Sequence, residues 1–209
     1  MKAKLISIAV GKSKTYKFSE KVFESAYKKD VFLNTVQVTK LGLVGDFQVD
    51  KRFHGGVDKA IHFGAIKHLE KNENFDKLAI GCNIFVDSFD EEDICLGDNY
   101  KIGEVELEVT QPRHPCWKIG ALFGKEVSRY ISKNSATGWY VRVLKEGNIN
   151  INDEMILTKR VSDITIRDLS SYISIPPSSR KIIDEILNSE VIGSSYKKDF
   201  FSSLEKNNS

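Results

Sequence analysis

Cysteine is scarce in this sequence: Cys82, Cys95 and Cys116 are the three among 209 residues. The number is odd and no two of them are closely spaced, which argues against a disulfide framework and against a zinc ribbon. We therefore expect reduced thiols and a cytoplasmic protein.

Long apolar runs are missing as well. The run over residues 5–10 is too short for the apolar part of a signal peptide, and we expect it to form a strand. No run approaches the roughly 20 residues that a membrane helix needs. The sequence therefore predicts no membrane association.

An excess of charge of one sign is also absent, because 31 Lys and Arg residues face 29 Asp and Glu residues. The formal net charge of +2 gives no general attraction to nucleic acid or to a membrane surface. An anionic ligand would have to be held by a local cluster of cations. Hydrophobic residues make up 41%, which is enough for a sizeable core.

What is present is mostly strand pattern. Val105, Leu107 and Val109 alternate with glutamates over residues 104–109, as on a half-buried strand. The same period recurs at 35–39 and 141–143, and glycine-containing turns separate the runs. Helices are expected at 65–71 and 117–132. Many strands with few helices favour a closed or sandwich-like β-domain.

The pattern changes after Arg160. Apolar stripes with helical spacing cover residues 166–173, 182–187 and 196–204, with Thr165 as the expected N-cap of the first. Short amphipathic helices are not stable alone in water, so these must pack on one another or on the β-domain. We expect a β-domain over 1–160 and a three-helix domain over 161–209, with ligand binding confined to the first.

The strongest candidate for chemistry is Cys116. It lies after a strand and before an expected helix, and it directly follows Pro115. Pro112 and Pro115 bracket the basic residues Arg113 and His114, and Lys118 is a further cation close in sequence. A helix start and nearby cations favour the thiolate, which is a nucleophile and a soft metal ligand. The alternative is a small buried core cysteine, a common fate of a free thiol.

A second candidate is the loop that contains Gly55 and Gly56. His54, Asp58 and Lys59 could converge there on a polar ligand, although the spacing is not that of a phosphate-binding Walker loop. The alternative is a charged hairpin in which the glycines only turn the chain. We expect His62 and His68 to be ordinary histidines beside a helix.

Two weaker candidates follow. Asn83 could hydrogen-bond a heterocyclic ligand or merely cap a turn. Arg142 follows Trp139 and Tyr140 on one strand and could hold an anion, although these three side chains could equally be core and rim.

In their order along the chain, these segments resemble the MOSC domain family, and more narrowly its YiiM-type proteins, which confer resistance to hydroxylaminopurine. Residues 160–165 open a segment similar to the three-helix domain at the end of that subgroup. The motifs that carry the resemblance are Gly45-Asp46, His54-Gly55-Gly56-x-Asp58-Lys59-Ala60, Gly81-x-Asn83, Gly97-Asp98, Gln111-Pro112-Arg113-x-Pro115-Cys116-Trp117-Lys118 and Gly138-Trp139-Tyr140.

The resemblance implies a mainly β protein with helices, namely a MOSC-type β-barrel followed by the three-helix domain. It implies binding of the molybdenum cofactor (molybdopterin), with Cys116 as metal ligand and catalytic residue. It further implies reduction of N-hydroxylated bases or amines with electrons from a separate reductase. The helices would then serve substrate access, homodimer formation or docking of that reductase.

The resemblance also suggests residues that bind the cofactor. Cations expected near its phosphate are Lys12, Lys59, Arg113 and Arg142, and polar contacts to the pterin are expected from His54, Asp58 and Asn83. One position departs from the family pattern, because Cys82 stands where a glutamate is usual. We expect Cys82 to be a neighbour of the site and not the metal ligand.

Two other functions stay open on the sequence. The protein could carry the cofactor, or sulfur as a persulfide on Cys116, without turnover of its own. It could also be a structural platform whose helices dock a partner.

Overall fold

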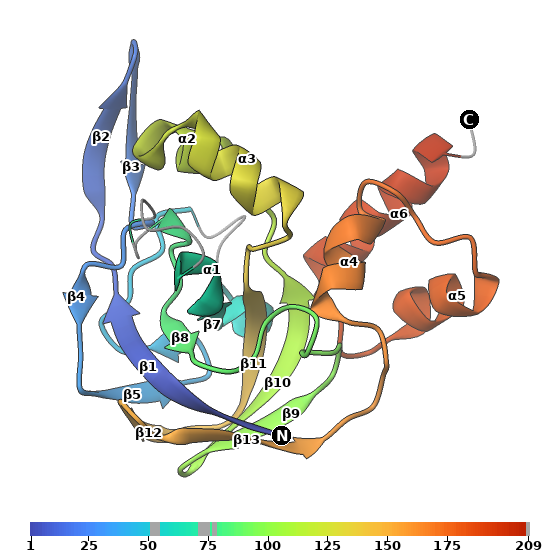
Figure 1. The fold of residues 1–209 in the computed structure, drawn as a ribbon, viewed down its shortest axis with the longest axis horizontal. Coiled ribbons are helices and arrows are strands. Elements are labelled where there is room, and N and C mark those ends of the chain that lie inside the picture. The colour runs from blue at the N-terminus through green and yellow to red at the C-terminus, as the bar shows by residue number, and fades with distance from the viewer. Residues whose placement is uncertain (51–54, 71–75, 77–78, 208–209) are drawn as a thin grey trace.

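The computed structural model describes residues 1–50, 55–70, 76 and 79–207. Its centre is a closed β-barrel (Figure 1). Around the ring the strands are β13 (Glu154–Lys159), β9 (Asn99–Ile102), β10 (Val105–Pro112), β11 (Trp139–Lys145), β7 (Ile61–Ala65), β8 (Ile84–Val86) and β1 (Lys2–Val10).

The ring closes because β1 returns to pair with β13, so that neither strand leaves a free edge there. Neighbours are antiparallel except β7 and β8, which run parallel. The predicted alternation on β10 is confirmed, since Val105, Leu107 and Val109 are all buried. The predicted mainly β fold with a barrel is therefore confirmed.

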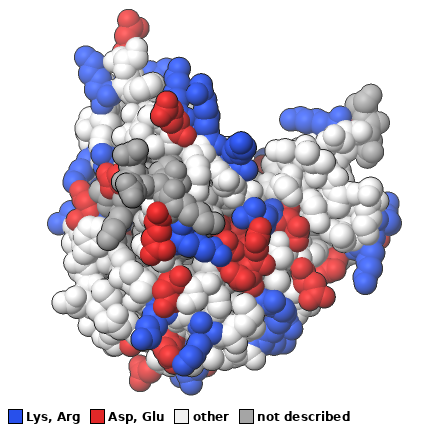
Figure 2. Space-filling model, viewed as in Figure 1, with Lys and Arg blue, Asp and Glu red and all other residues white. Residues whose placement is uncertain are grey.

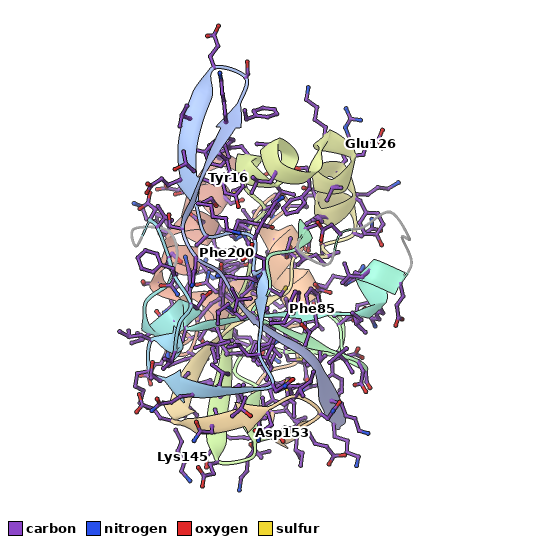
Figure 3. The ribbon with its side chains drawn as sticks, turned by 90° about the vertical axis from the view of Figure 1, so that its left-hand side faces the viewer. Tyr16, Phe85, Glu126, Lys145, Asp153 and Phe200 are labelled. Atoms are coloured by element: carbon purple, nitrogen blue, oxygen red, sulfur yellow. The ribbon has the colours of Figure 1, made fainter. Side chains whose placement is uncertain are left out.

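A hairpin and a small sheet extend the barrel. The hairpin of β2 (Lys14–Phe18) and β3 (Lys21–Ser25) rises at the same end of the barrel as the helices of residues 117–133. Lys145 and Asp153 lie at the opposite end (Figures 1 and 3). Lys and Arg side chains gather over the hairpin and those helices (Figure 2). The remaining strands are β4 (Val31–Phe32) on β1, and β5 (Thr35–Thr39), β6 (Gly42–Leu43) and β12 (Gly147–Asn150), which form the small sheet.

The helix predicted over 117–132 is two helices, α2 (Trp117–Phe123) and α3 (Lys125–Lys133). Gly124 separates them with a φ of 97°, a conformation that glycine adopts readily because it has no Cβ. The helix expected at 65–71 begins later, as α1 (Lys67–Glu70), because Ala65 is still the last residue of β7, and residue 71 is outside the described part. The 3-10 helix η1 (Val57–Lys59) precedes β7.

The three C-terminal helices are confirmed as α4 (Ile166–Tyr172), α5 (Arg180–Asn188) and α6 (Ser194–Asn207), which group beside the barrel (Figure 1). Thr165 caps α4 as predicted, in a capping box with Asp168. None of the helices in the described ranges is long and apolar enough to cross a membrane.

The hydrophobic core runs across the predicted boundary at residue 160. Leu169, Ile186, Tyr196 and Phe200 belong to the same buried cluster as the barrel residue Leu107. The helices therefore bury their apolar faces against the barrel and not only against one another. Their separability from ligand binding stays a prediction.

Tyr196 tests this shared core, since it is fully buried and its hydroxyl donates to the Leu169 carbonyl at 2.6 Å. We expect Tyr196→Ala to lower the free energy of unfolding by about 3–5 kcal/mol through the cavity it leaves. Tyr196→Phe, which removes only the hydroxyl, should cost about 1 kcal/mol. Urea unfolding followed by tryptophan fluorescence and far-UV circular dichroism measures both variants. The two signals should change together in the wild type, and separate transitions would contradict a shared core.

Candidate functional site

Two cavities meet at Cys116. The inner cavity has a volume of about 70 Å³ and the outer cavity about 340 Å³. The outer volume lies in the range of small-molecule sites, about 300–1,000 Å³. The residues that line both are Asp50, Lys59, Arg113, Cys116, Lys118 and Tyr140.

The chain presents the Cys116 thiol at this junction. Strand β10 ends at Pro112, and Cys116 takes the N-cap position of α2 with an extended backbone (φ −123°, ψ 163°). It is partly exposed, whereas Cys82 and Cys95 are buried. The alternative of a buried core cysteine at position 116 is therefore wrong.

Arg113 is buried in the wall of both cavities. Its guanidinium lies 4.4 Å from the ring centre of Tyr27, and Nη1 donates to the Ile80 carbonyl at 2.9 Å. Nε is buried and has no hydrogen-bond partner among the described residues. A permanently charged group with an unpaired buried donor suits an anionic ligand group.

His62 is the residue that sequence reasoning missed. It lies on β7 in the wall of the inner cavity, 2.7 Å from the Thr137 carbonyl through Nε2 and 3.4 Å from Arg113 Nη1 through Nδ1. Burial, together with the charge of Arg113, lowers its pKa to about 3. Nε2 donates to the Thr137 carbonyl in the neutral tautomer that we assign, and Nδ1 lies between the Gly81 carbonyl, at 3.2 Å, and Arg113 Nη1. The feature of the sequence that could have identified His62 as a site residue is a histidine within an otherwise apolar strand.

A buried ion pair between Lys29 and Asp46 forms another part of the inner cavity. The Lys29 ammonium lies 2.6 and 2.8 Å from the two Asp46 oxygens, and Asp46 also accepts from the Gly11 amide at 2.8 Å. Burial lowers the pKa of Lys29, and the carboxylate opposes that shift. Asp46 belongs to the Gly45-Asp46 motif of the family resemblance, but no pattern in the sequence around Lys29 indicated that Lys29 lies in the site.

The two lysines predicted to lie near the cofactor phosphate differ in their position relative to the two cavities. Lys59 is partly buried and lines both cavities, and burial lowers its pKa. Lys12 is exposed and lines neither cavity, although it follows Gly11 directly. His54 lies outside the described residues.

Asp58 and Arg142 pair with each other away from both cavities. Arg142 Nη2 lies 2.6 Å from Asp58, Nη1 lies 3.0 Å from Glu108, and Nη2 also donates to the Val191 carbonyl at 3.2 Å. These contacts tie β11 to the segment between α5 and α6. The structure therefore gives both residues a role in holding the helices on the barrel and does not bring them to Cys116.

Asn83 lines the inner cavity, and its side chain joins three strands. Its Nδ2 donates to the Ala9 carbonyl and its Oδ1 accepts from the His62 amide, both at 3.2 Å. These bonds hold β1 and β7 at the start of β8, where Asn83 lies.

Cys82 lies behind the wall of the inner cavity. Its neighbours in sequence line that cavity, but its own side chain packs in an apolar cluster with Leu69 and Phe85, 3.8 Å from His62 Nε2. Gly64 makes room for it, because a Cβ there would lie 2.4 Å from the sulfur. Burial raises the pKa of Cys82 well above its ordinary value.

His114 does not supply the positive charge expected beside Cys116. Its ring stacks on Tyr196 of α6, with ring centres 6.0 Å apart, and burial lowers its pKa. It is therefore mainly neutral at neutral pH.

His68, expected to be an ordinary histidine beside a helix, makes a buried contact with a carboxylate. Its Nε2 lies 2.6 Å from the fully buried Glu91, which also accepts from the Gly138 amide at 2.7 Å.

The different burial of the three thiols predicts their order of reaction. Iodoacetamide at pH 7.5 should label Cys116 at least about tenfold faster than Cys82 or Cys95, because a buried thiol with a raised pKa holds little accessible thiolate. The pKa of Cys95 is raised by burial to about 11, so its labelling should increase as the pH approaches that value. Mass spectrometry of digests measures each site. Equal rates at pH 7.5 would contradict this placement.

Comparisons with known proteins agree with the fold. A model of the MOSC domain family matches residues 50–156. Protein YiiM of Escherichia coli (strain K12) is 31% identical over 145 residues, which are 65% of each chain. A protein of Gibberella moniliformis named "Reductase" is 32% identical over 167 residues, which are 75% of this chain and 29% of that protein.

Among solved structures, YiiM from Geobacillus stearothermophilus superimposes with a TM-score of 0.77 at 26% identity, and the match covers 97% of this chain and 99% of that one. The match to its whole length includes the helices after residue 160. The chain therefore belongs to the MOSC domain family, as a protein of the YiiM type.

Proposed function

We propose that this protein binds the molybdenum cofactor and reduces N-hydroxylated bases or amines at Cys116. MOSC domains are associated with binding of this cofactor. The observation that carries the proposal is the meeting of two cavities at a partly exposed thiol, beside a buried guanidinium with an unpaired nitrogen. The naming of the Gibberella relative as a reductase supports redox chemistry.

The residues present fit the cofactor. A thiolate from Cys116 is a soft ligand of the kind that molybdenum accepts. Arg113 and Lys59 line both cavities and would neutralise the phosphate of the pterin, and Lys29 lines the inner cavity. Lys12 and His54 stay candidates on the resemblance alone, while we assign Asp58 and Arg142 to the attachment of the helices.

The reaction removes the oxygen of an N–O bond. An N-hydroxylated amine takes up two electrons and two protons, the N–O bond breaks, and the products are the amine and water. The cofactor supplies the electron transfer when bound. This chain would orient the substrate at Cys116 and keep the anionic groups of the cofactor paired with cations.

Because each turnover consumes two electrons, the proposal includes a separate electron-donating reductase as partner, with a small N-hydroxylated molecule as substrate. A carrier function is the second candidate, because an accessible Cys116 thiol could also hold a persulfide. Bound cofactor without reduction of any N-hydroxylated compound, in the presence of a competent reductant, would favour the carrier.

Replacing Cys116 by serine tests the proposed ligand. Serine is similar in size but offers a hard, barely ionised oxygen, so Cys116→Ser should lose molybdenum and lower turnover at least about 100-fold. The fold should persist, with a thermal midpoint close to that of the wild type, because the side chain is not part of the core. Metal analysis, pterin fluorescence and reduction of a hydroxylamine substrate measure these properties.

The matched control is Cys82→Ala, which removes the thiol behind the cavity wall. This variant should keep its molybdenum, although loss of the buried sulfur lowers its stability. If Cys82→Ala loses the metal while Cys116→Ser keeps it and its activity, the ligand assignment is reversed.

A further inference from the structure

The carboxylate of Glu91 is fully buried, although Glu91 is not among the described residues that line either cavity. Its Oε2 lies 2.6 Å from His68 Nε2 of α1, and its Oε1 accepts from the Gly138 amide at 2.7 Å. The Glu91 carbonyl accepts from the Arg167 amide of α4 at 2.9 Å. Contacts from two helices therefore hold the carboxylate against the turn that leads into β11.

The peptide group between Thr137 and Gly138 connects Glu91 to the site. Its N–H donates to Glu91, and its carbonyl accepts from His62 Nε2 at 2.7 Å. Gly138 has a φ of 74°, and a Cβ there would lie 2.0 Å from the Phe63 carbonyl oxygen, so glycine is needed at this turn. Bonding of the N–H to a carboxylate polarises the peptide group and makes its carbonyl a stronger acceptor.

Two carbonyls compete for the single N–H proton of neutral His62. The Thr137 carbonyl lies 2.7 Å from Nε2, and the Gly81 carbonyl lies 3.2 Å from Nδ1. When Nε2 carries the proton, Nδ1 is free to accept from Arg113 Nη1, 3.4 Å away. When Nδ1 carries it, Arg113 loses this acceptor. The tautomer of His62 thus decides whether the ring can help to hold the guanidinium.

We propose that Glu91 is a positioning residue, which acts through the Thr137–Gly138 peptide group to select the tautomer of His62 with the proton on Nε2. The same turn also supports the backbone of Arg113, because the Gly138 carbonyl accepts from the Arg113 amide at 3.2 Å. Glu91 thereby sets the partners of Arg113 without touching a ligand. The use of Arg113 to hold the anionic group of a cofactor rests on the proposed function, whereas the choice of tautomer does not.

Nitrogen-15 NMR of the histidine-labelled full chain tests the role of Glu91. The wild type should carry the His62 proton on Nε2. Glu91→Gln keeps the shape of the side chain and removes its charge, which makes the hydrogen bond from Gly138 about half as strong. The ratio of the Nδ1–H to the Nε2–H tautomer should therefore rise at least about threefold. Glu91→Met, which removes both acceptor oxygens, should make Nδ1–H the main form.

The matched control is Glu92→Gln, since Glu92 is the exposed neighbour of Glu91 and pairs with Arg167. This variant should keep the wild-type tautomer. A wild-type proton on Nδ1, or a wild-type tautomer ratio in Glu91→Gln, overturns the inference. Glu91→Gln alone decides the outcome if Glu91→Met does not fold.

Molybdenum content, measured on the same samples, separates this inference from the proposed function. A Glu91-dependent tautomer in protein that never holds molybdenum supports the role of Glu91 and contradicts the proposed function. An unchanged tautomer in Glu91→Gln that holds molybdenum and reduces a hydroxylamine contradicts the role of Glu91 alone.

Discussion

A permanently charged guanidinium lies buried in the wall of the two cavities, and much of the surrounding site is arranged to accommodate it. Arg113 has the face of Tyr27, the Ile80 carbonyl and the Nδ1 of His62 as its partners. Its charge is one reason why His62 stays neutral, since a second cation beside it would be costly. Those partners come from three separate segments of the chain, so Arg113 is held in this way only in the folded protein.

The contacts that hold Arg113 also help to position the Cys116 thiol. Arg113 lies three residues before Cys116, so fixing the guanidinium also fixes the start of the segment that presents the thiol. On the other side of that segment, His114 packs against Tyr196 of α6. The thiol is thus placed between the barrel and the C-terminal helices, and the outer cavity exists because both are there. A rigid frame of this kind is what a site needs to orient a ligand to within a fraction of an ångström, about 0.5 Å.

Local patterns in the sequence predicted local structure well. Strict alternation identified β10, and Thr165 identified the start of α4, because each signal involves residues within a few positions of one another. The prediction of one helix over 117–132 failed at Gly124, where a glycine can either continue a helix or break it.

The sequence by itself determined barrel strands such as β10 and β11, the helical end of the chain and the choice of Cys116 as the candidate residue, since periodicity, capping and motif order are local properties of the sequence. Tertiary structure alone decided the rest. It paired Lys29 with Asp46, brought His62 to Thr137 and Glu91 to Gly138, and turned Asp58 and Arg142 toward each other. It also brought Asp199 of α6 to the cavity beside Cys116. Such contacts join residues from 17 to 84 positions apart, and burial lowers the pKa values of Lys29 and His62, so no local pattern could have revealed them.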